Sequence, residues 1–245
     1  MKKSLLFATL LLAGCSGVAL DHHPHWGYEG EQSPEHWGQI APEFALCGAG
    51  QNQSPVNIQG ALKAQQTPLK LSFQPGQQEI VNNGHTIQVN AHGQNTLVLD
   101  ADTFVLQQFH FHAPSENQID GKSFPLEAHF VYQNNEGALA VLALMFNQGN
   151  ASRPLQQAWQ HMPTQVNQPG LLSTPINIEI LLPDQLDFYR FSGSLTTPPC
   201  SDGVRWLVLK QPVSASAEQI QQFRTVMQHA NNRPVQPLNG RVIIH

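Results

Sequence analysis

The chain has 245 residues, of which 40% are hydrophobic and only 12% charged, and its formal net charge is −5 at pH 7. This length fits one large domain or two small ones, and because no linker, repeat or low-complexity block divides the chain, we expect a single domain. The weak negative charge argues against nucleic acid as a partner, since nucleic acid binds basic surfaces.

Residues 1–19 predict a secretory signal, with a basic start and an apolar stretch too short to span a bilayer. Two processing sites stay open. Cleavage after Ala19 would leave a domain of residues 20–245, whereas Cys15 lies in a sequence that resembles a bacterial lipobox, and its acylation would remove residues 1–14. Loss of the two lysines takes the net charge from −5 to −7. We therefore expect a periplasmic or secreted protein with no transmembrane segment, anchored to a membrane only if it is a lipoprotein.

Three histidines, His22, His23 and His25, stand near the expected mature start. We expect a mobile terminal segment with solvated imidazoles. Adventitious metal binding, zinc capture and proton transfer at a cavity rim remain alternatives.

Most of the remaining chain predicts strands, and the apolar run Ala138–Phe146 should be central to the sheet. The other predicted strands outside the histidine segments are Leu69–Phe73, Ile80–Asn90, Thr96–Leu99, Ile176–Leu182 and Arg205–Leu209.

Two helices are predicted, one after Ser152 with Pro154 near its start and one from Ser216, where Gln219 completes a capping box. In the second helix a core-facing stripe falls at helical spacing and comprises Ile220, Phe223, Val226, Met227 and Ala230.

His110 and His112 lie two residues apart on a predicted strand, so their side chains share a face. The same alternation places Gln108 on the face of the two histidines and assigns the other residues of the strand to one face or the other. Phe104 and Leu106 would share the histidine face, whereas Val105, Phe109 and Phe111 would take the opposite, apolar face.

A second strand segment runs from Leu126 to Tyr132 and places His129 on one face with Glu127. The short polar connection contains the turn signal Asp120-Gly121, so the two segments are expected to pair antiparallel and bring the three imidazoles together.

Three neutral imidazoles suit a catalytic zinc site, because tetrahedral zinc then keeps a fourth position for water and lowers the pKa of that water to about 7. Gln108 and Glu127 each stand two residues before a ligand on its own face, where they are expected to orient and polarise the imidazoles. The cofactor predicted from these residues is Zn²⁺.

Short motifs stand along almost the whole mature length: His25-Trp26-Gly27-Tyr28, Gln53-Ser54-Pro55-Val56-Asn57-Ile58, Asn82-Asn83-Gly84-His85, Gln108 to His112, Ser115-Glu116-Asn117, Glu127-Ala128-His129, Ser194-Leu195-Thr196-Thr197-Pro198-Pro199 and Arg233-Pro234-Val235-Gln236-Pro237-Leu238. In the order and spacing of these motifs the chain resembles an α-class carbonic anhydrase of the bacterial, secreted type.

The resemblance implies a mainly β (α+β) fold in one domain. It implies a large, twisted, mostly antiparallel central sheet of about ten strands, with helices on the surface and zinc in a conical cavity. The implied reaction is the reversible hydration of carbon dioxide to bicarbonate and a proton.

The resemblance also assigns roles to individual residues. Thr196 would accept a hydrogen bond from the zinc-bound nucleophile and donate its own proton to Glu116, because a carboxylate only accepts. The apolar wall for carbon dioxide would comprise Val131, Val141, Leu195, Val204 and Trp206, and Thr197 would meet departing bicarbonate.

His85 matches the family's proton shuttle. Ejection of the proton directly to hydroxide at neutral pH would allow on the order of 10³ turnovers per second at most, so fast turnover needs a buffering group inside the protein. An imidazole with a pKa near 6.5 suits that task. Tyr28, Asn83 and Gln88 are the expected water-ordering neighbours, and Gln88 stands where animal relatives often have Asn.

Once Cys15 is set aside, Cys47 and Cys200 remain as an even pair in an oxidising compartment, which favours a disulfide. Such a bridge would anchor the loop that bears Thr196.

Two other functions stay open at this level. The chain could be a noncatalytic zinc-binding surface module, or a zinc esterase that uses the same site. The expected small-molecule partners are carbon dioxide and bicarbonate, and the resemblance leaves a homodimer open.

Overall fold

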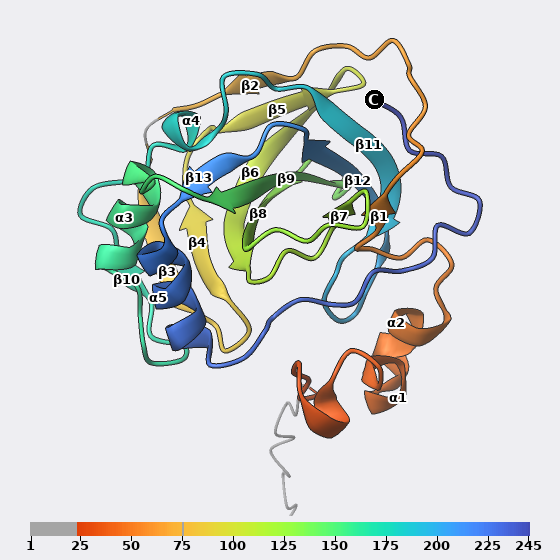
Figure 1. Ribbon diagram of the computed structural model, residues 1–245, viewed down its shortest axis with the longest axis horizontal. Coiled ribbons are helices and arrows are strands. Elements are labelled where there is room, and N and C mark those ends of the chain that lie inside the picture. Colours follow the sequence, from red (N-terminus) through yellow and green to blue (C-terminus); the bar gives the residue numbers. More distant parts are fainter. Residues whose placement is uncertain (1–23, 75) are drawn as a thin grey trace, which may run out of the picture.

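A large twisted sheet forms the body of the molecule (Figure 1), and the computed structural model describes residues 24–245 except residue 75. The predicted signal, both processing sites, Cys15 included, and the histidines His22 and His23 lie outside the described residues. Among the residues described, the sheet has 11 strands. Eight of them lie side by side in the order β10-β3-β4-β6-β8-β9-β12-β11. The other three lie off this path, where β5 pairs with β6, β2 pairs with β5 and β13 pairs with β9. All pairs are antiparallel except β12 and β13 with β9. The expectation of a mainly β fold with a large, mostly antiparallel sheet is confirmed.

The strands of this sheet are β2 (Lys70–Ser72), β3 (Gln78–Asn82), β4 (Ile87–Ala91), β5 (Thr96–Leu99), β6 (Asp102–His112), β8 (Leu126–Gln133), β9 (Leu139–Gln148), β10 (Gly170–Leu171), β11 (Phe188–Ser194), β12 (Asp202–Leu209) and β13 (Val213–Ala215). A separate parallel pair comprises β1 (Asn57–Ile58) and β7 (Gln118–Ile119). The α-helices are α1 (Trp37–Ile40), α2 (Ala45–Ala49), α3 (Arg153–Gln160), α4 (Ile178–Leu181) and α5 (Ala217–Met227), and the 3₁₀ helices are η1 (Gly30–Gln32) and η2 (Pro42–Phe44). Of the helices that the structure describes, none is long and apolar enough to cross a membrane.

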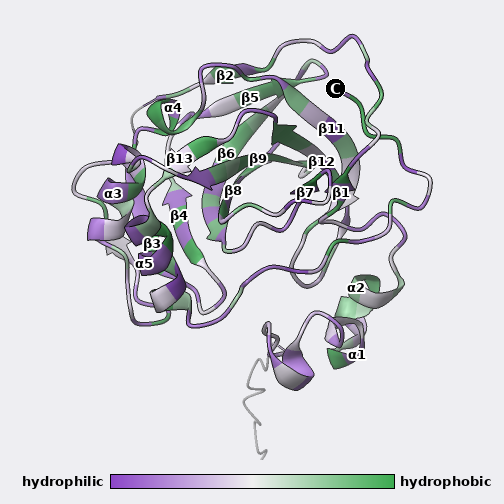
Figure 2. Ribbon diagram, viewed as in Figure 1, coloured by the Kyte–Doolittle hydropathy of each residue, from purple (hydrophilic) through white to green (hydrophobic). Residues whose placement is uncertain are grey.

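The two faces of the sheet bury different groups. One face packs against α3 and α5, where Phe111 contacts Trp159 and Phe223 at ring-centroid distances of 4.9 and 6.3 Å. Strands β9 and β12 are coloured mostly hydrophobic in Figure 2, whereas α3 and α5 mix both kinds of residue, as helices that cover a core do. The opposite face holds a smaller apolar cluster around Trp206 and the three predicted zinc ligands.

Helix α5 begins as predicted, because the Ser216 hydroxyl accepts the Gln219 N–H and the Gln219 side chain accepts the Ser216 N–H. Ile220, Phe223 and Met227 are buried on its core side. Ala230 was wrongly included in this stripe, since α5 ends at Met227.

Two strand predictions were wrong in detail. Residues 178–181 form the short helix α4, because the Asn177 side chain accepts the Ile180 N–H and caps a helical turn. The predicted strand Ile80–Asn90 is a hairpin of β3 and β4, and its turn contains Gly84 at φ +86°, a conformation that glycine tolerates. Strand β11 was not predicted.

A β-bulge interrupts strict alternation in β6, where the pairing with β8 shifts between Leu106 and Gln108. The extra residue reverses the alternation, so Phe104 and Leu106 lie in the same buried core as Phe109. The prediction that Phe104 and Leu106 share the histidine face was therefore wrong, and so was the placement of Val105 on the opposite face. Gln108, His110 and His112 follow the bulge and keep their common alternation.

Candidate metal centre

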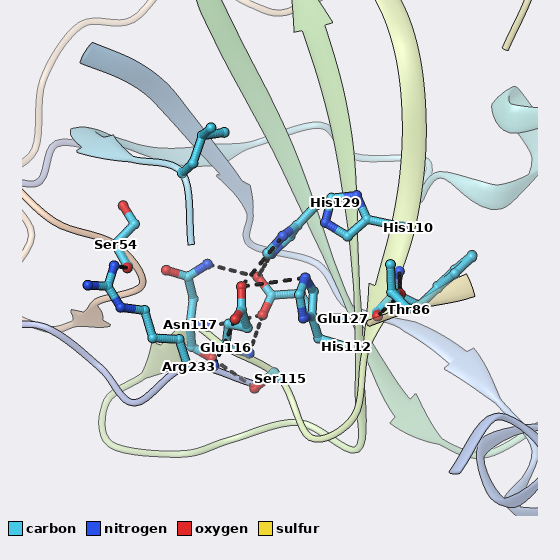
Figure 3. Close-up of polar contacts among 12 residues, drawn as sticks. Ser54, Thr86, His110, His112, Ser115, Glu116, Asn117, Glu127, His129 and Arg233 are labelled. Carbon is cyan, nitrogen blue, oxygen red and sulfur yellow. Dashed lines mark hydrogen bonds and ion pairs between the residues drawn. The ribbon is translucent and has the colours of Figure 1, made fainter. Parts of the chain in front are cut away.

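Three histidines converge on one face of neighbouring strands. His110 of β6 lies opposite His129 of β8 in the strand register, and His112 follows two residues later. Each imidazole offers one nitrogen, and these atoms all lie within 4.8 Å of one another. Figure 3 shows the three rings facing a common point, with Glu116 and Glu127 close to them. The predicted antiparallel pairing of the two segments is confirmed.

The second ring nitrogens of His110 and His112 are occupied by acceptors. His110 Nδ1 lies 2.8 Å from Gln108 Oε1, and His112 Nδ1 lies 2.6 Å from the backbone carbonyl of Asn231. Because both oxygens only accept, each Nδ1 must bear the proton. The Nε2 lone pairs of both rings are thereby free for a cation.

His129 uses the opposite nitrogen. Its Nε2 lies 2.9 Å from Glu127 Oε1, which leaves Nδ1 to face the other two ligands. Glu127 also accepts the backbone N–H groups of Glu116 at 2.6 Å and Asn117 at 3.0 Å, and the Asn117 side-chain amide at 2.8 Å. The carboxylate is thus surrounded by donors, which fixes the direction of the His129 ring.

Burial lowers the pKa values of His110, His112 and His129 below the ordinary histidine value, so the three rings are neutral at neutral pH. His112 Nε2 is buried and has no hydrogen-bond partner in the described part of the chain. A buried, unpartnered lone pair is costly unless a ligand satisfies it. Three neutral imidazoles that each offer one nitrogen within this small distance fit zinc, and the predicted Zn²⁺ site is consistent with this geometry.

Glu116 lies against the open side of this group, with Oε2 3.5 Å from His112 Nε2 and 3.8 Å from His129 Nδ1. Burial raises the pKa of Glu116 to about 8, while hydrogen bonds from the Arg233 backbone N–H and the Thr196 hydroxyl act in the opposite direction. The Arg233 N–H donates to Oε1 at 2.8 Å. A divalent cation beside Oε2 would favour the ionised carboxylate.

A cavity of about 110 Å³ opens beside the histidines. Its lining brings together most of the polar residues that the sequence singled out, namely Tyr28, Asn83, His85, Gln88, Gln108, His110, His112 and Thr197, and adds Trp26 and Thr86. His85 stacks on Trp26 with ring centroids 3.7 Å apart. Burial, with additional effects of His25 and His229, lowers the pKa of His85 to about 4, which is well below the value expected from sequence.

The five residues expected to form the apolar wall belong to one cluster on the metal face. Val141, Val204 and Trp206 are buried in it, and Val131 and Leu195 pack against it. The edge of Trp206 meets His129 at a centroid distance of 4.9 Å, so the cluster reaches the metal centre. Only glycine fits at position 193 beside this indole, since a Cβ there would lie 2.9 Å from Trp206 Cδ1 and would also clash with Ser54 Oγ.

The predicted disulfide joins Cys47 to Cys200, and its cysteines are 153 residues apart. It ties α2 to the loop that follows Thr196 and Thr197. Arg233 strengthens the same junction, because its guanidinium donates to the Cys47 carbonyl at 2.7 Å.

Sequence reasoning did not identify three functional neighbours. Asn231 accepts from His112 and also donates its side-chain amide to the His85 carbonyl at 3.0 Å. Asn117 and Arg233 stand in the quoted motifs, but nothing in their spacing predicted contacts with Glu127 and Glu116. The contact of Asn231 uses a backbone carbonyl, which leaves no signal in residue type.

Known proteins share both sequence and architecture with this chain. A family model described as eukaryotic-type carbonic anhydrase matches residues 32–245. Carbonic anhydrases of Pectobacterium atrosepticum and Pectobacterium carotovorum are 63% and 61% identical, over 96% and 99% of this chain and 97% and 100% of those proteins. The structure of the α-carbonic anhydrase from Thermovibrio ammonificans with the inhibitor sulfanilamide is similar at a TM-score of 0.89 and 48% identity, covering 91% of this chain and all of that one.

Proposed function

The chain belongs to the eukaryotic-type, or α, carbonic anhydrase family and catalyses the zinc-dependent, reversible hydration of carbon dioxide to bicarbonate and a proton, and we propose how its residues divide that reaction. The observation that best supports this division is the pairing of each imidazole with its own acceptor. Gln108, Asn231 and Glu127 each occupy one ring nitrogen, so three lone pairs are directed at one point.

His110, His112 and His129 hold the zinc ion. When bound, zinc supplies a nucleophile at neutral pH by lowering the pKa of water to about 7. Because all three ligands are neutral, they leave the charge of the cation undiminished.

Thr196 aims the nucleophile. Its hydroxyl donates to Glu116, which leaves an oxygen lone pair to accept from the attacking group and fixes the direction of attack. Glu116 is held in turn by the Arg233 N–H. Carbon dioxide lies against Val131, Val141, Leu195, Val204 and Trp206, an apolar wall that suits an uncharged substrate, and Thr197 at the cavity meets the bicarbonate product.

His85 receives the proton that each hydration releases. It lines the same cavity as His110 and His112, and its ring stacks on Trp26. The ring stacked on Trp26 has a pKa of about 4, so in that position it is neutral but accepts a proton less readily than a solvated imidazole would. Protonation then favours movement of the ring away from Trp26 toward water, because the charged form is the one that burial penalises. Tyr28, Asn83 and Gln88 order water between His85 and the metal centre.

The disulfide indicates a protein outside the cytoplasm. We propose export to the periplasm or the exterior, with cleavage after Ala19 or lipid anchoring through Cys15 as the two alternatives. Mass spectrometry of the mature N-terminus distinguishes them. The resemblance is compatible with a homodimer, and light scattering of the purified protein tests whether it forms.

Stopped-flow carbon dioxide hydration of the zinc-loaded protein and of its His85→Ala variant tests the proposed roles. We expect kcat in dilute buffer to fall in the variant and to recover with added imidazole, while kcat/KM is unchanged. Full kcat without His85 would remove the shuttle role. Zinc-loaded protein without hydration activity, or with ester hydrolysis as its main activity, would overturn the assignment.

A further inference from the structure

Four polar side chains form one hydrogen-bonded row on strands β3 and β4 and the turn between them. The Asn83 amide donates to Gln88 Oε1 at 3.3 Å, the Gln88 amide donates to Asn90 Oδ1 at 2.7 Å, and the Asn90 amide donates to Glu79 Oε1 at 3.2 Å. We call Asn83, Gln88, Asn90 and Glu79 the amide ladder. It runs away from the cavity, which Asn83 and Gln88 line but Asn90 and Glu79 do not.

The direction of the ladder is set at both ends. At one end, Asn83 Oδ1 accepts the backbone N–H groups of His85 and Thr86, each at 2.9 Å. The NH₂ group of Asn83 must therefore face Gln88. At the other end, the carboxylate of Glu79 can only accept, so the NH₂ group of Asn90 must face it. Both ends impose the same orientation on Gln88.

The ladder lies beside the metal ligands. In the strand register Asn90 stands between Glu79 and Gln108, and Gln88 stands opposite His110. Glu79, Gln88 and Asn90 are half-buried and alternate with buried core residues along their strands, so they share the cavity side of the sheet.

We propose that Glu79 is a positioning residue for proton transfer, because it supplies the terminal acceptor that orients the ladder. The orientation decides which N–H groups and lone pairs Gln88 and Asn83 present to cavity water, and it steadies the turn that bears His85. This inference rests on the proposed shuttle role of His85. Glu79 acts only through Asn90, Gln88 and Asn83.

Four variants test the hydrogen bond between positions 79 and 90, because they differ in whether this bond is kept. Glu79→Met removes the acceptor, whereas Glu79→Gln keeps one, since its Oε1 can still accept from Asn90. Asn90→Asp places two carboxylates against each other. The double variant Glu79→Gln/Asn90→Asp restores the contact with reversed roles, because the new amide donates to the new carboxylate while Gln88 still donates to it. Its net charge equals that of the wild type.

Two measurements on zinc-loaded protein test the proposal. We expect Glu79→Met and Asn90→Asp to lower kcat in dilute buffer about tenfold, the lower end of the usual effect of losing outer hydrogen-bond partners, with kcat/KM unchanged. The second measurement, independent of activity, is backbone amide hydrogen exchange at His85 and Thr86, which should be faster in both variants. Glu79→Gln should keep kcat and the exchange rates at the wild-type level, and the double variant should restore them to that level. The matched control is Glu136→Gln, which makes the same chemical change at an exposed residue in a turn.

Unchanged kcat and exchange in Glu79→Met would overturn the proposal, as would a loss in Asn90→Asp that the double variant does not restore. His85→Ala measured in parallel separates the two hypotheses. If His85→Ala loses kcat while Glu79→Met does not, only the role of Glu79 fails. If His85→Ala keeps full kcat, the shuttle fails, and the proposal that depends on it fails too.

Discussion

The imidazole of His85 stacks on the indole of Trp26 at 3.7 Å, with the two rings 7° from parallel. This contact removes water from one face of the imidazole, and burial is the main reason that the pKa of His85 falls to about 4. The position of the ring therefore sets its basicity, and Trp26 is the residue that holds it.

Replacing Trp26 by leucine should raise the pKa of His85 toward 6.5, because the smaller side chain exposes the ring to water. NMR titration of the His85 ring measures this directly. A midpoint that stays near 4 in Trp26→Leu would show that His25 and His229, not the stacking, depress the pKa.

The same shift has a consequence for stability. The folded pKa of about 4 lies below the unfolded value of 6.5, so between these values the unfolded chain binds more protons. The contribution of His85 to the free energy of unfolding is present above pH 6.5 and is lost as the pH falls to about 4. Urea unfolding between pH 4 and 6.5 should therefore show a weaker pH dependence in Trp26→Leu than in the wild type.

Glu127→Gln should weaken zinc binding about 10- to 100-fold. Every group that contacts Glu127 is a donor, so one end of a glutamine amide must face a donor whichever way it turns. Competition with a zinc chelator measures the affinity. An unchanged affinity would show that Glu127 does not orient His129. Glu136→Gln makes the same chemical change at an exposed site and should leave the affinity unchanged.

Thr196→Val should lower kcat/KM for hydration by about 100-fold, a typical loss for one hydrogen-bonding group that acts on developing charge. The shape of the side chain is kept, and Thr196 is not a ligand, so zinc content should stay at the wild-type level. Thr225→Val on α5 deletes a hydroxyl remote from the cavity and serves as the control. Equal activity of both variants would exclude Thr196 from aiming the nucleophile.

The ligand set could be predicted from sequence because it depends on local geometry. His110 and His112 share a face through strand alternation, and the turn at Asp120 and Gly121, both at positive φ, brings His129 back beside them. Gln108 and Glu127 followed from the same alternation. The prediction for Phe109 and Phe111 was also right, but that for Phe104, Val105 and Leu106 failed because a bulge before Gln108 is not visible in the pattern of residue types.

Contacts made by distant segments could not be predicted in this way. The acceptor for His112 is a backbone carbonyl at residue 231, and the pKa of His85 depends on Trp26, which lies about sixty positions earlier in the chain. The order of the strands and the parallel pairing of β12 with β9 depend on long-range packing. The resemblance implied the architecture, but local patterns alone did not contain it.

Replacing Cys47 and Cys200 together by serine should lower the free energy of unfolding by about 2 to 5 kcal/mol, because the bridge closes a long loop in the unfolded chain. The native contacts of the junction remain in part, since Gln53 donates to the Cys200 carbonyl at 2.9 Å and Arg233 to the Cys47 carbonyl. We therefore expect the variant to fold and keep its zinc. Its kcat/KM should fall only if loss of the disulfide loosens the loop that bears Thr196. Urea unfolding with and without reductant measures the effect. If reductant destabilises the double variant as much as the wild type, the stability does not come from this disulfide.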